Sequence, residues 1–149
     1  MRRQKQKFYC FVALVLSALI WVGCGRPVQP SQHDELAAAD DTQVGRAFKT
    51  RASGVQVAGE GVVASILPDD LSGRRHQRFI VRLASGQTVL VEHNIDIAPR
   101  VDGLQPGDTI SFSGEYVWND KGGMVHWTHH DPAGKHVAGW LKFKGRTYQ

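Results

Sequence analysis

Three histidines and an aspartate lie within six residues, in the segment His126-Trp127-Thr128-His129-His130-Asp131. Histidine is the side chain whose unperturbed pKa lies nearest neutral pH, so this density of imidazoles suits proton transfer or metal binding. The competing interpretation is structural, because a histidine beside a tryptophan on a strand is often a hydrogen-bonded core or rim residue. The segment is therefore the leading candidate for a site, and its chemistry stays open.

Regular strand geometry would separate these side chains. His129 and His130 would point to opposite faces, and His130 would lie roughly 13 Å beyond His126. A bend could bring them together, and Asp131-Pro132 makes one plausible because the residue before proline favours extended or turn geometry. His136 could then return toward the same region. The ligand-binding residues expected in this segment are Trp127, Thr128, His129, His130 and Asp131.

A metal site is one interpretation of His126 taken together with other segments. Histidines and a carboxylate suit a divalent ion of the zinc or magnesium class, with an open position for water in a catalytic site. We expect His93, Asp96 and His126 to hold the ion, while His76 and His126 act in acid–base catalysis and Arg78 steadies a phosphoester. Regular alternation puts His76 and His93 on opposite faces, so this site requires a bulge or a loop position at His76. The competing interpretation is that the histidines hydrogen-bond loops and cap a barrel.

Arginines on the outward face of one predicted strand form a second candidate. Arg78 and Arg82 alternate with Phe79 and Val81, so both point away from the core. Binding of a phosphate or carboxylate would be their simplest use, and plain solvation is the alternative. Nearby tryptophans and tyrosines could add a stacking surface or could simply fill the core. The further ligand-binding residues expected here are Arg82, Asn94 and Arg100.

Residues 52–149 contain short strands separated by turn signals. The expected strands span residues 55–67, 77–84, 88–93, 109–118, 124–130 and 137–143. Glycines within the first stretch indicate a bulge or sharp coil. The order predicts an all-β fold, a small OB-like antiparallel barrel of five or six strands, with a β-sandwich as the competing architecture. An OB-like barrel binds ligands on strands two and three and on the loops 1–2 and 4–5.

The hairpin around Gly86 sets the predicted register of the second and third strands. Pairing Leu83 with Val89 matches apolar to apolar and continues to Phe79 opposite His93. A slip by one residue would reverse every side chain and is therefore disfavoured. We also expect the loop between strands four and five to lie at the same end as the loop between one and two. That placement would bring His126, at the start of strand five, toward the other histidines.

The N-terminus has the layout of a signal peptide, expected to span residues 1–23. Four basic residues among residues 2–7 precede an apolar run over residues 8–23. That run is shorter than the roughly 20 residues of a comfortable membrane span, so we expect export, with an uncleaved anchor as the alternative. Trp21-Val22-Gly23-Cys24 resembles the lipobox of bacterial lipoproteins, which implies lipidation of Cys24. Trp21 departs from the Leu-like residue of that pattern, and an ordinary signal peptide is the competing interpretation.

Removal of the signal segment changes the charge balance. The 18 Lys and Arg fall to 14, equal to the 14 Asp and Glu, once the four in the signal segment are removed. A formally neutral mature chain argues against strong non-specific nucleic-acid binding. Because Cys10 and Cys24 both fall within or next to the signal, we expect no internal disulfide. The mature protein would be periplasmic or anchored to the outer membrane through its lipid, and secreted if it is not lipidated.

Residues 24–51 are expected to form a linker, with one possible short helix over residues 33–49 before the barrel domain at 52–149. Within that domain, the segments 76–79, 93–100 and 122–132 resemble, in this order, an uncharacterised family of short exported bacterial proteins, domain-of-unknown-function family 3465. The resemblance covers about residues 52–149 and implies no activity.

Two functions from different classes remain open. The first is a small exported hydrolase, resembling a nuclease or phosphodiesterase, that uses the metal site. The second is a periplasmic or surface binding module for a small anion, a glycan, an oligonucleotide or a protein partner. The sequence contains no nucleophile elbow, phosphate loop, CxxC pair or HExxH motif that would identify a known catalytic class.

Overall fold

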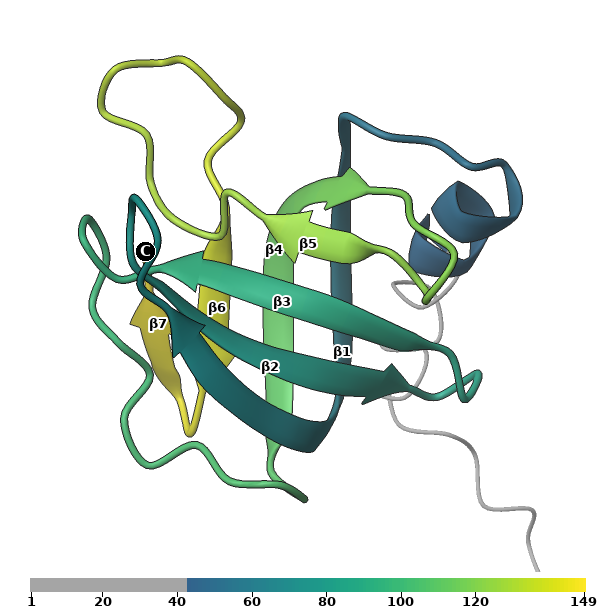
Figure 1. The fold of residues 1–149 in the computed structure, drawn as a ribbon, viewed down its shortest axis with the longest axis horizontal. Coiled ribbons are helices and arrows are strands. Elements are labelled where there is room, and N and C mark those ends of the chain that lie inside the picture. The colour runs from purple at the N-terminus through teal and green to yellow at the C-terminus, as the bar shows by residue number, and fades with distance from the viewer. Residues whose placement is uncertain (1–42) are drawn as a thin grey trace, which may run out of the picture.

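The computed structural model describes residues 43–149, which fold into a seven-stranded sheet and one short helix over residues 43–49 (Figure 1). The strands are β1 (Val55–Asp70), β2 (His76–Leu83), β3 (Thr88–Asn94), β4 (Thr109–Val117), β5 (Met124–His126), β6 (Trp140–Phe143) and β7 (Arg146–Tyr148). The all-β prediction is confirmed, with seven strands in place of five or six. The predicted signal segment, Cys24 and the first part of the predicted helix lie outside the described residues.

Five of these strands form a closed, barrel-like ring. Their order is β1-β2-β3-β5-β4, and β4 pairs back with β1. This is the strand order expected of an OB-like fold. The pairs are antiparallel except β3 with β5, which run parallel, so the prediction of a fully antiparallel barrel is wrong at that pair. The reason is topological. The connection from β3 to β5 contains β4 and is therefore a crossover and not a hairpin, and a crossover can join parallel strands.

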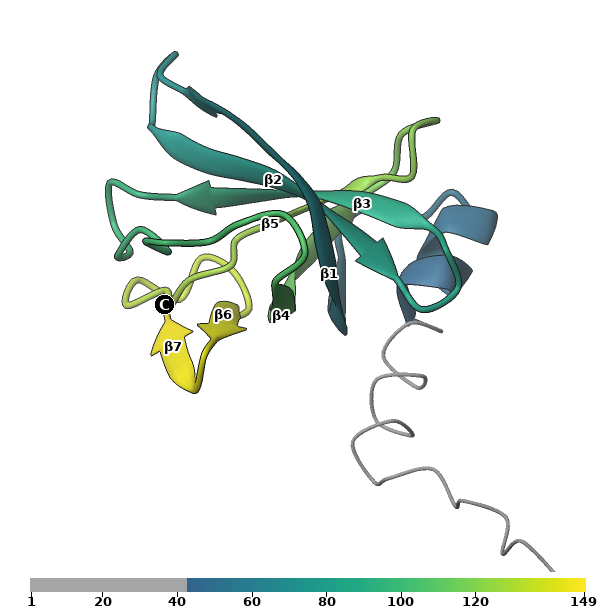
Figure 2. The ribbon, with the colours of Figure 1, turned by 90° about the horizontal axis from the view of Figure 1, so that it is seen from below.

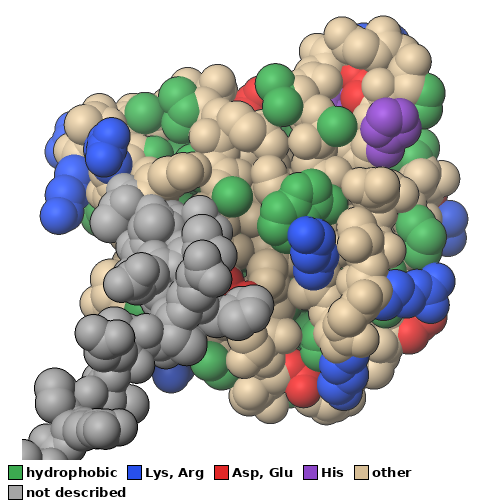
Figure 3. Space-filling view, turned by 180° about the vertical axis from the view of Figure 1, so that it is seen from behind, with side chains coloured by type: hydrophobic (Ala, Val, Ile, Leu, Met, Phe, Trp, Pro, Cys, Tyr) green, Lys and Arg blue, Asp and Glu red, His purple; other side chains and the backbone are tan. Residues whose placement is uncertain are grey.

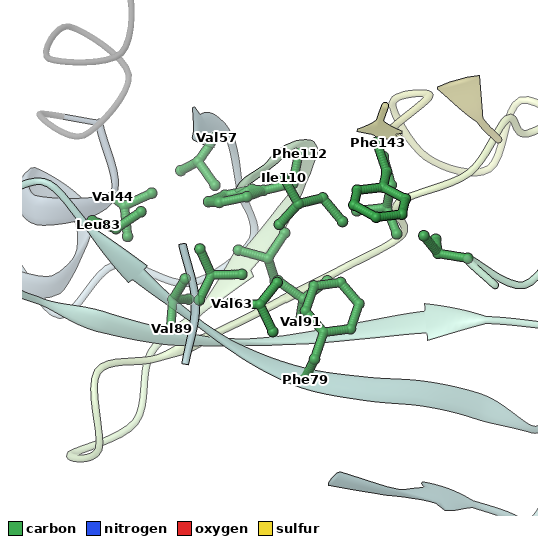
Figure 4. Close-up of a cluster of buried hydrophobic side chains, with 14 of the residues drawn as sticks. Val44, Val57, Val63, Phe79, Leu83, Val89, Val91, Ile110, Phe112 and Phe143 are labelled. Carbon is green, nitrogen blue, oxygen red and sulfur yellow. The ribbon is translucent and has the colours of Figure 1, made fainter. Parts of the chain in front are cut away.

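The core fills the inside of the ring with aliphatic and aromatic side chains. Val63, Phe79 and Phe112 are at most 1% exposed and meet in the centre (Figure 4). The helix adds Val44 and Ala47 to the same core. It therefore belongs to the packed unit, which begins before residue 52. No helix among residues 43–149 is long and apolar enough to cross a membrane.

The β2–β3 hairpin differs from its predicted register by two residues. Phe79 pairs with Val91, and Gln77 pairs with His93. The turn explains the shift, because the Gly86 N–H donates to the Leu83 carbonyl at 2.9 Å and Gly86 has a φ of 86°. A glycine in the left-handed region permits this turn, which centres the hairpin one residue earlier than predicted. A shift of two leaves every side chain on its predicted face, so His93 still points inward.

Strand β5 ends at His126, four residues earlier than predicted. The expected position of the loop between β4 and β5 was also wrong, because it lies at the β2–β3 hairpin, where Gln87 Nε2 donates to the Gly122 carbonyl at 3.2 Å. His126 is therefore at the end of β5 and not at its start. Since β5 runs parallel to β3, its end still lies beside the end of β3 and the start of β2.

A projecting loop, residues 127–139, separates β5 from β6 (Figures 1 and 2). Both strands pair with the same edge of β4, β5 with Glu115–Val117 and β6 with Ser111–Ser113. The loop leaves the sheet between these two pairings and returns there. In both views it lies on the side of the ring away from the helix.

Candidate functional site

A cleft of about 900 Å³ opens at the end of the ring where β2 begins and β3 ends. Its two walls are the β1–β2 loop with the adjoining strand ends and the projecting loop 127–139. Five of the six histidines among residues 43–149 line it, and on the rear face histidine is in view only beside the projecting loop (Figure 3). These lining histidines are His76, His126, His129, His130 and His136.

The chain bends at Trp127, which has a φ of 53°. This left-handed conformation is rare for a bulky residue and ends the alternation of β5. The Trp127 ring then lies among three imidazoles, with centroids 5.2 Å from His126, 5.8 Å from His129 and 4.4 Å from His136. The predicted bend therefore exists, but it precedes Asp131-Pro132. That dipeptide begins a second turn instead, in which Gly134 N donates to the Asp131 carbonyl at 3.2 Å.

Asp131 holds the second half of the loop together. Its Oδ1 accepts from Ala133 N at 3.0 Å, and its Oδ2 accepts from the backbone N–H groups of His136, at 2.8 Å, and Lys135. Burial alone would raise the pKa of Asp131, but these three N–H groups together lower it. The carboxylate lines the cleft while its hydrogen-bonding capacity is largely used by the loop backbone.

His93 lies beneath the cleft and is fully buried. Its Nε2 is 3.0 Å from the Pro99 carbonyl, which can only accept, so Nε2 carries the hydrogen. Nδ1 therefore accepts from the Thr128 hydroxyl at 2.8 Å. Burial lowers the pKa of His93 to about 4, so the ring is neutral at pH 7. With both nitrogens occupied, His93 ties β3 to the base of the projecting loop.

The predicted metal ligands are not brought together. Both carboxylate oxygens of Asp96 bind Arg75, at 2.8 Å to its backbone N and 2.6 Å to Nε, and these bonds lower the pKa of Asp96. His126 Nε2 lies 3.3 Å from Glu115 Oε1, its cross-strand neighbour. Among residues 43–149, no three His, Cys, Asp or Glu side chains are arranged to hold a metal ion. His76 pairs directly with Asn94 in the β2–β3 ladder, and the irregularity near it lies in β1, where the register shifts between Leu67 and Asp70, the partner of His76.

The predicted arginines lie away from the cleft. Arg78 Nε donates to the Pro68 carbonyl at 3.0 Å, and Arg100 pairs with Asp69. Arg82 is exposed on β2. The sequence correctly predicted the outward face of β2, but that face lies on the side of the ring and the cleft lies at its end. Of the remaining predicted residues, Asn94, His130 and Trp127 line the cleft, and Thr128 is buried below it.

Two cationic residues of the cleft were not predicted. Arg74 and Lys135 face it from opposite walls. Neither side chain has a hydrogen bond or ion pair within residues 43–149. A shared signal was present in the sequence, because each follows a glycine that adopts a positive φ, 73° at Gly73 and 64° at Gly134. A cationic residue directly after a turn glycine lies in a loop, where its side chain does not pack against the sheet.

His129 differs from the other lining histidines in its burial. It is 3% exposed, and its Nδ1 donates to the His130 carbonyl at 2.8 Å. Its Nε2 is buried and has no hydrogen-bond partner among the described residues. Burial lowers the pKa of His129. The neutral ring thus keeps an unshared electron pair on Nε2, at the wall of the cleft.

Comparison with known proteins yields one family. The family described as "Protein of unknown function (DUF3465)" matches residues 28–149. A search of curated proteins found no match. The matched range includes β1 to β7 and both walls of the cleft. The chain therefore belongs to the domain-of-unknown-function family 3465.

Proposed function

We propose that this protein is an exported binding module whose cleft takes a small anionic ligand without chemical conversion. The observation that carries the proposal is the pair of unpartnered cations, Arg74 and Lys135, on opposite walls of one cleft. A guanidinium or ammonium group binds carboxylate and phosphate oxygens through charge-assisted hydrogen bonds. An anion between the walls could bind both groups at once.

The surroundings of the cleft favour an anion over a cation-rich ligand. Asp131 is the one acidic side chain of residues 43–149 that lines it, and its oxygens already accept three backbone N–H groups. His76 and His130 add further ring nitrogen atoms to the lining, and their imidazole side chains have no hydrogen-bond partner within the described residues. The lining therefore offers two free cationic groups to an anion and one carboxylate whose oxygens are already used by the loop backbone.

The hydrolase hypothesis has less support. It requires His93, Asp96 and His126 around one ion and Arg78 beside the substrate, and the four side chains bind other groups. The binding hypothesis needs only the cleft in its present form. Export rests on the signal layout of residues 1–23 and on the lipobox-like sequence ending at Cys24.

Calorimetric titration of the purified protein with inorganic phosphate, pyrophosphate and citrate tests the proposal. Arg74→Gln and Lys135→Gln should each weaken binding by roughly tenfold, because each removes one charged hydrogen bond. Arg82→Gln is the matched control, since Arg82 is an exposed arginine that does not line the cleft. Equal effects at Arg74 and Arg82 would contradict the assignment of the cleft.

Turnover is tested on the same preparation. Incubation with bis-p-nitrophenyl phosphate, with and without added Mg²⁺ or Zn²⁺, should release no nitrophenol above the protein-free rate. Release that depends on the metal and is lost in His126→Ala would favour the hydrolase instead. For the anchor, Cys24→Ser should move the protein from the membrane fraction to the soluble fraction of the producing bacterium.

A further inference from the structure

Two histidines of the projecting loop have the same hydrogen-bonding arrangement. His129 Nδ1 lies 2.8 Å from the carbonyl of His130, and His136 Nδ1 lies 2.8 Å from the carbonyl of Val137. A carbonyl oxygen can only accept, so Nδ1 carries a hydrogen in both rings. Metal-binding histidines commonly donate their second ring N–H to a backbone carbonyl, which fixes the tautomer and orients the ligating nitrogen.

The second ring nitrogen, Nε2, of both His129 and His136 lacks a hydrogen-bond partner among the described residues. His129 Nε2 is buried and unpaired. The His136 side chain is 8% exposed, and its Nε2 faces Asp131 Oδ2 at 3.8 Å, which is too long for a hydrogen bond. A buried polar atom without a partner is costly and calls for a ligand, an ion or a water. In the neutral form of His136, its Nε2 and Asp131 Oδ2 are two acceptor atoms that face each other with no hydrogen between them.

The loop holds the two rings in a fixed relation. Their centroids are 4.8 Å apart and the rings are perpendicular, at 89°. Trp127 stacks on the outer ring, with 4.4 Å between its centroid and that of His136. Asp131 binds the backbone N–H of His136, and the base of the loop is closed by Gly139 N donating to the His129 carbonyl at 2.9 Å. These contacts fix the positions of both rings without using their Nε2 atoms, as a preformed binding site requires.

We infer that His129 and His136 are the protein ligands of a transition-metal ion, Zn²⁺ or Cu²⁺. Imidazole nitrogen suits both ions. The site differs from the one expected from the sequence and does not depend on the proposed anion binding. Since no third His, Cys, Asp or Glu among residues 43–149 is in place as a ligand, water or a small anion from the cleft completes the coordination. The Asp131 carboxylate, whose Oδ2 lies 3.8 Å from His136 Nε2, would neutralise part of the added charge.

Copper titration followed by tryptophan fluorescence and by calorimetry is the direct test. After treatment with a chelator, the protein should bind one Cu²⁺ and lose part of its emission, because the Trp127 indole stacks on a ligand. Zn²⁺ should compete for the same site. His129→Gln and His136→Gln should each weaken binding by at least about tenfold. His130→Gln is the matched control, since that histidine is exposed and adjacent.

Further variants separate this site from the anion site and from unfolding. Arg74→Gln should retain copper binding, and Trp127→Phe should retain affinity in calorimetry while losing the quenching. Circular dichroism establishes that each variant is folded, and His136→Gln carries the test if the more buried His129→Gln does not fold. The inference is overturned if no stoichiometric binding occurs, or if His130→Gln weakens binding as much as the other two. It is also overturned if nitrogen NMR shows His136 as an imidazolium paired with Asp131 whose signals do not respond to the metal.

Discussion

His93 makes the stability of the protein depend on pH. Burial holds its pKa at about 4 in the folded protein, whereas an unfolded histidine titrates near 6.5. The unfolded chain therefore binds the proton first as the pH falls. The stability that follows from a neutral His93 is complete above about pH 6.5 and is lost toward pH 4, by roughly 3 kcal/mol in all.

Urea unfolding at about pH 7 and about pH 5 measures this loss, and His93 should account for roughly 2 kcal/mol of it. Carboxylates also titrate at the lower pH, so the comparison must be made between variants. His93→Gln should show a smaller loss than the unmodified protein, and His130→Gln should show the same loss. A His93→Gln variant with the full pH dependence would place the titration elsewhere.

Thr128 is the residue on which the His93 hydrogen bond depends. Thr128→Val keeps the shape and removes the donor to His93 Nδ1, leaving a buried acceptor unsatisfied. We expect a loss of about 1 to 3 kcal/mol in the free energy of unfolding, measured by urea denaturation. Thr128→Ser should restore most of it, and Thr147→Val, at an exposed threonine of β7, should change it little.

The projecting loop depends on a close backbone approach at its C-terminal end. A Cβ at Gly139 would overlap the carbonyl oxygens of Trp127 and Ser113, and neither belongs to a flexible side chain. Gly139→Ala should therefore destabilise the protein by at least about 2 kcal/mol and lower its Tm. Gly45→Ala is the contrasting variant, because a Cβ there has ordinary space and lies in a helix. It should leave Tm unchanged or raise it.

The sequence predicted elements better than the geometry between them. The period-two pattern placed Phe79 and Arg78 on the correct faces, because burial of one face fixes parity. It could not fix the register, which depended on the φ of Gly86. His126 was placed in the right region through a wrong position of the β4–β5 loop. The contacts of His93 with Thr128 and Pro99 could not be predicted, because an inward-facing histidine looks the same in sequence whether it binds a metal or a threonine. Arg74 could not be predicted as a cleft residue, because its position depends on the turn at Gly73 and not on a periodic pattern of apolar residues.

At the scale of the whole molecule, the helix before the sheet completes the core. Val44 is fully buried and Ala47 is 5% exposed, both within the same cluster as Leu83. A protein that begins at residue 52 should be less stable than one that begins at residue 43, by roughly 2 to 4 kcal/mol, because the helix no longer covers apolar surface. Val44→Ser in the full chain is the independent variant and should shift Tm in the same direction. Equal unfolding midpoints for the two lengths would contradict the role of the helix.

The end-to-end placement of β5 and β6 on one edge of β4 has a consequence for how this protein could diversify. The ring and its core are complete on either side of the interruption, so the nine residues between His129 and Gly139 can change without disturbing a single ladder hydrogen bond. The loop is thus a segment that can be replaced as a unit, and one backbone hydrogen bond, from Gly139 N to the His129 carbonyl, closes its base. Related proteins could share one scaffold and differ in what they capture, and a designer could graft a new recognition sequence there.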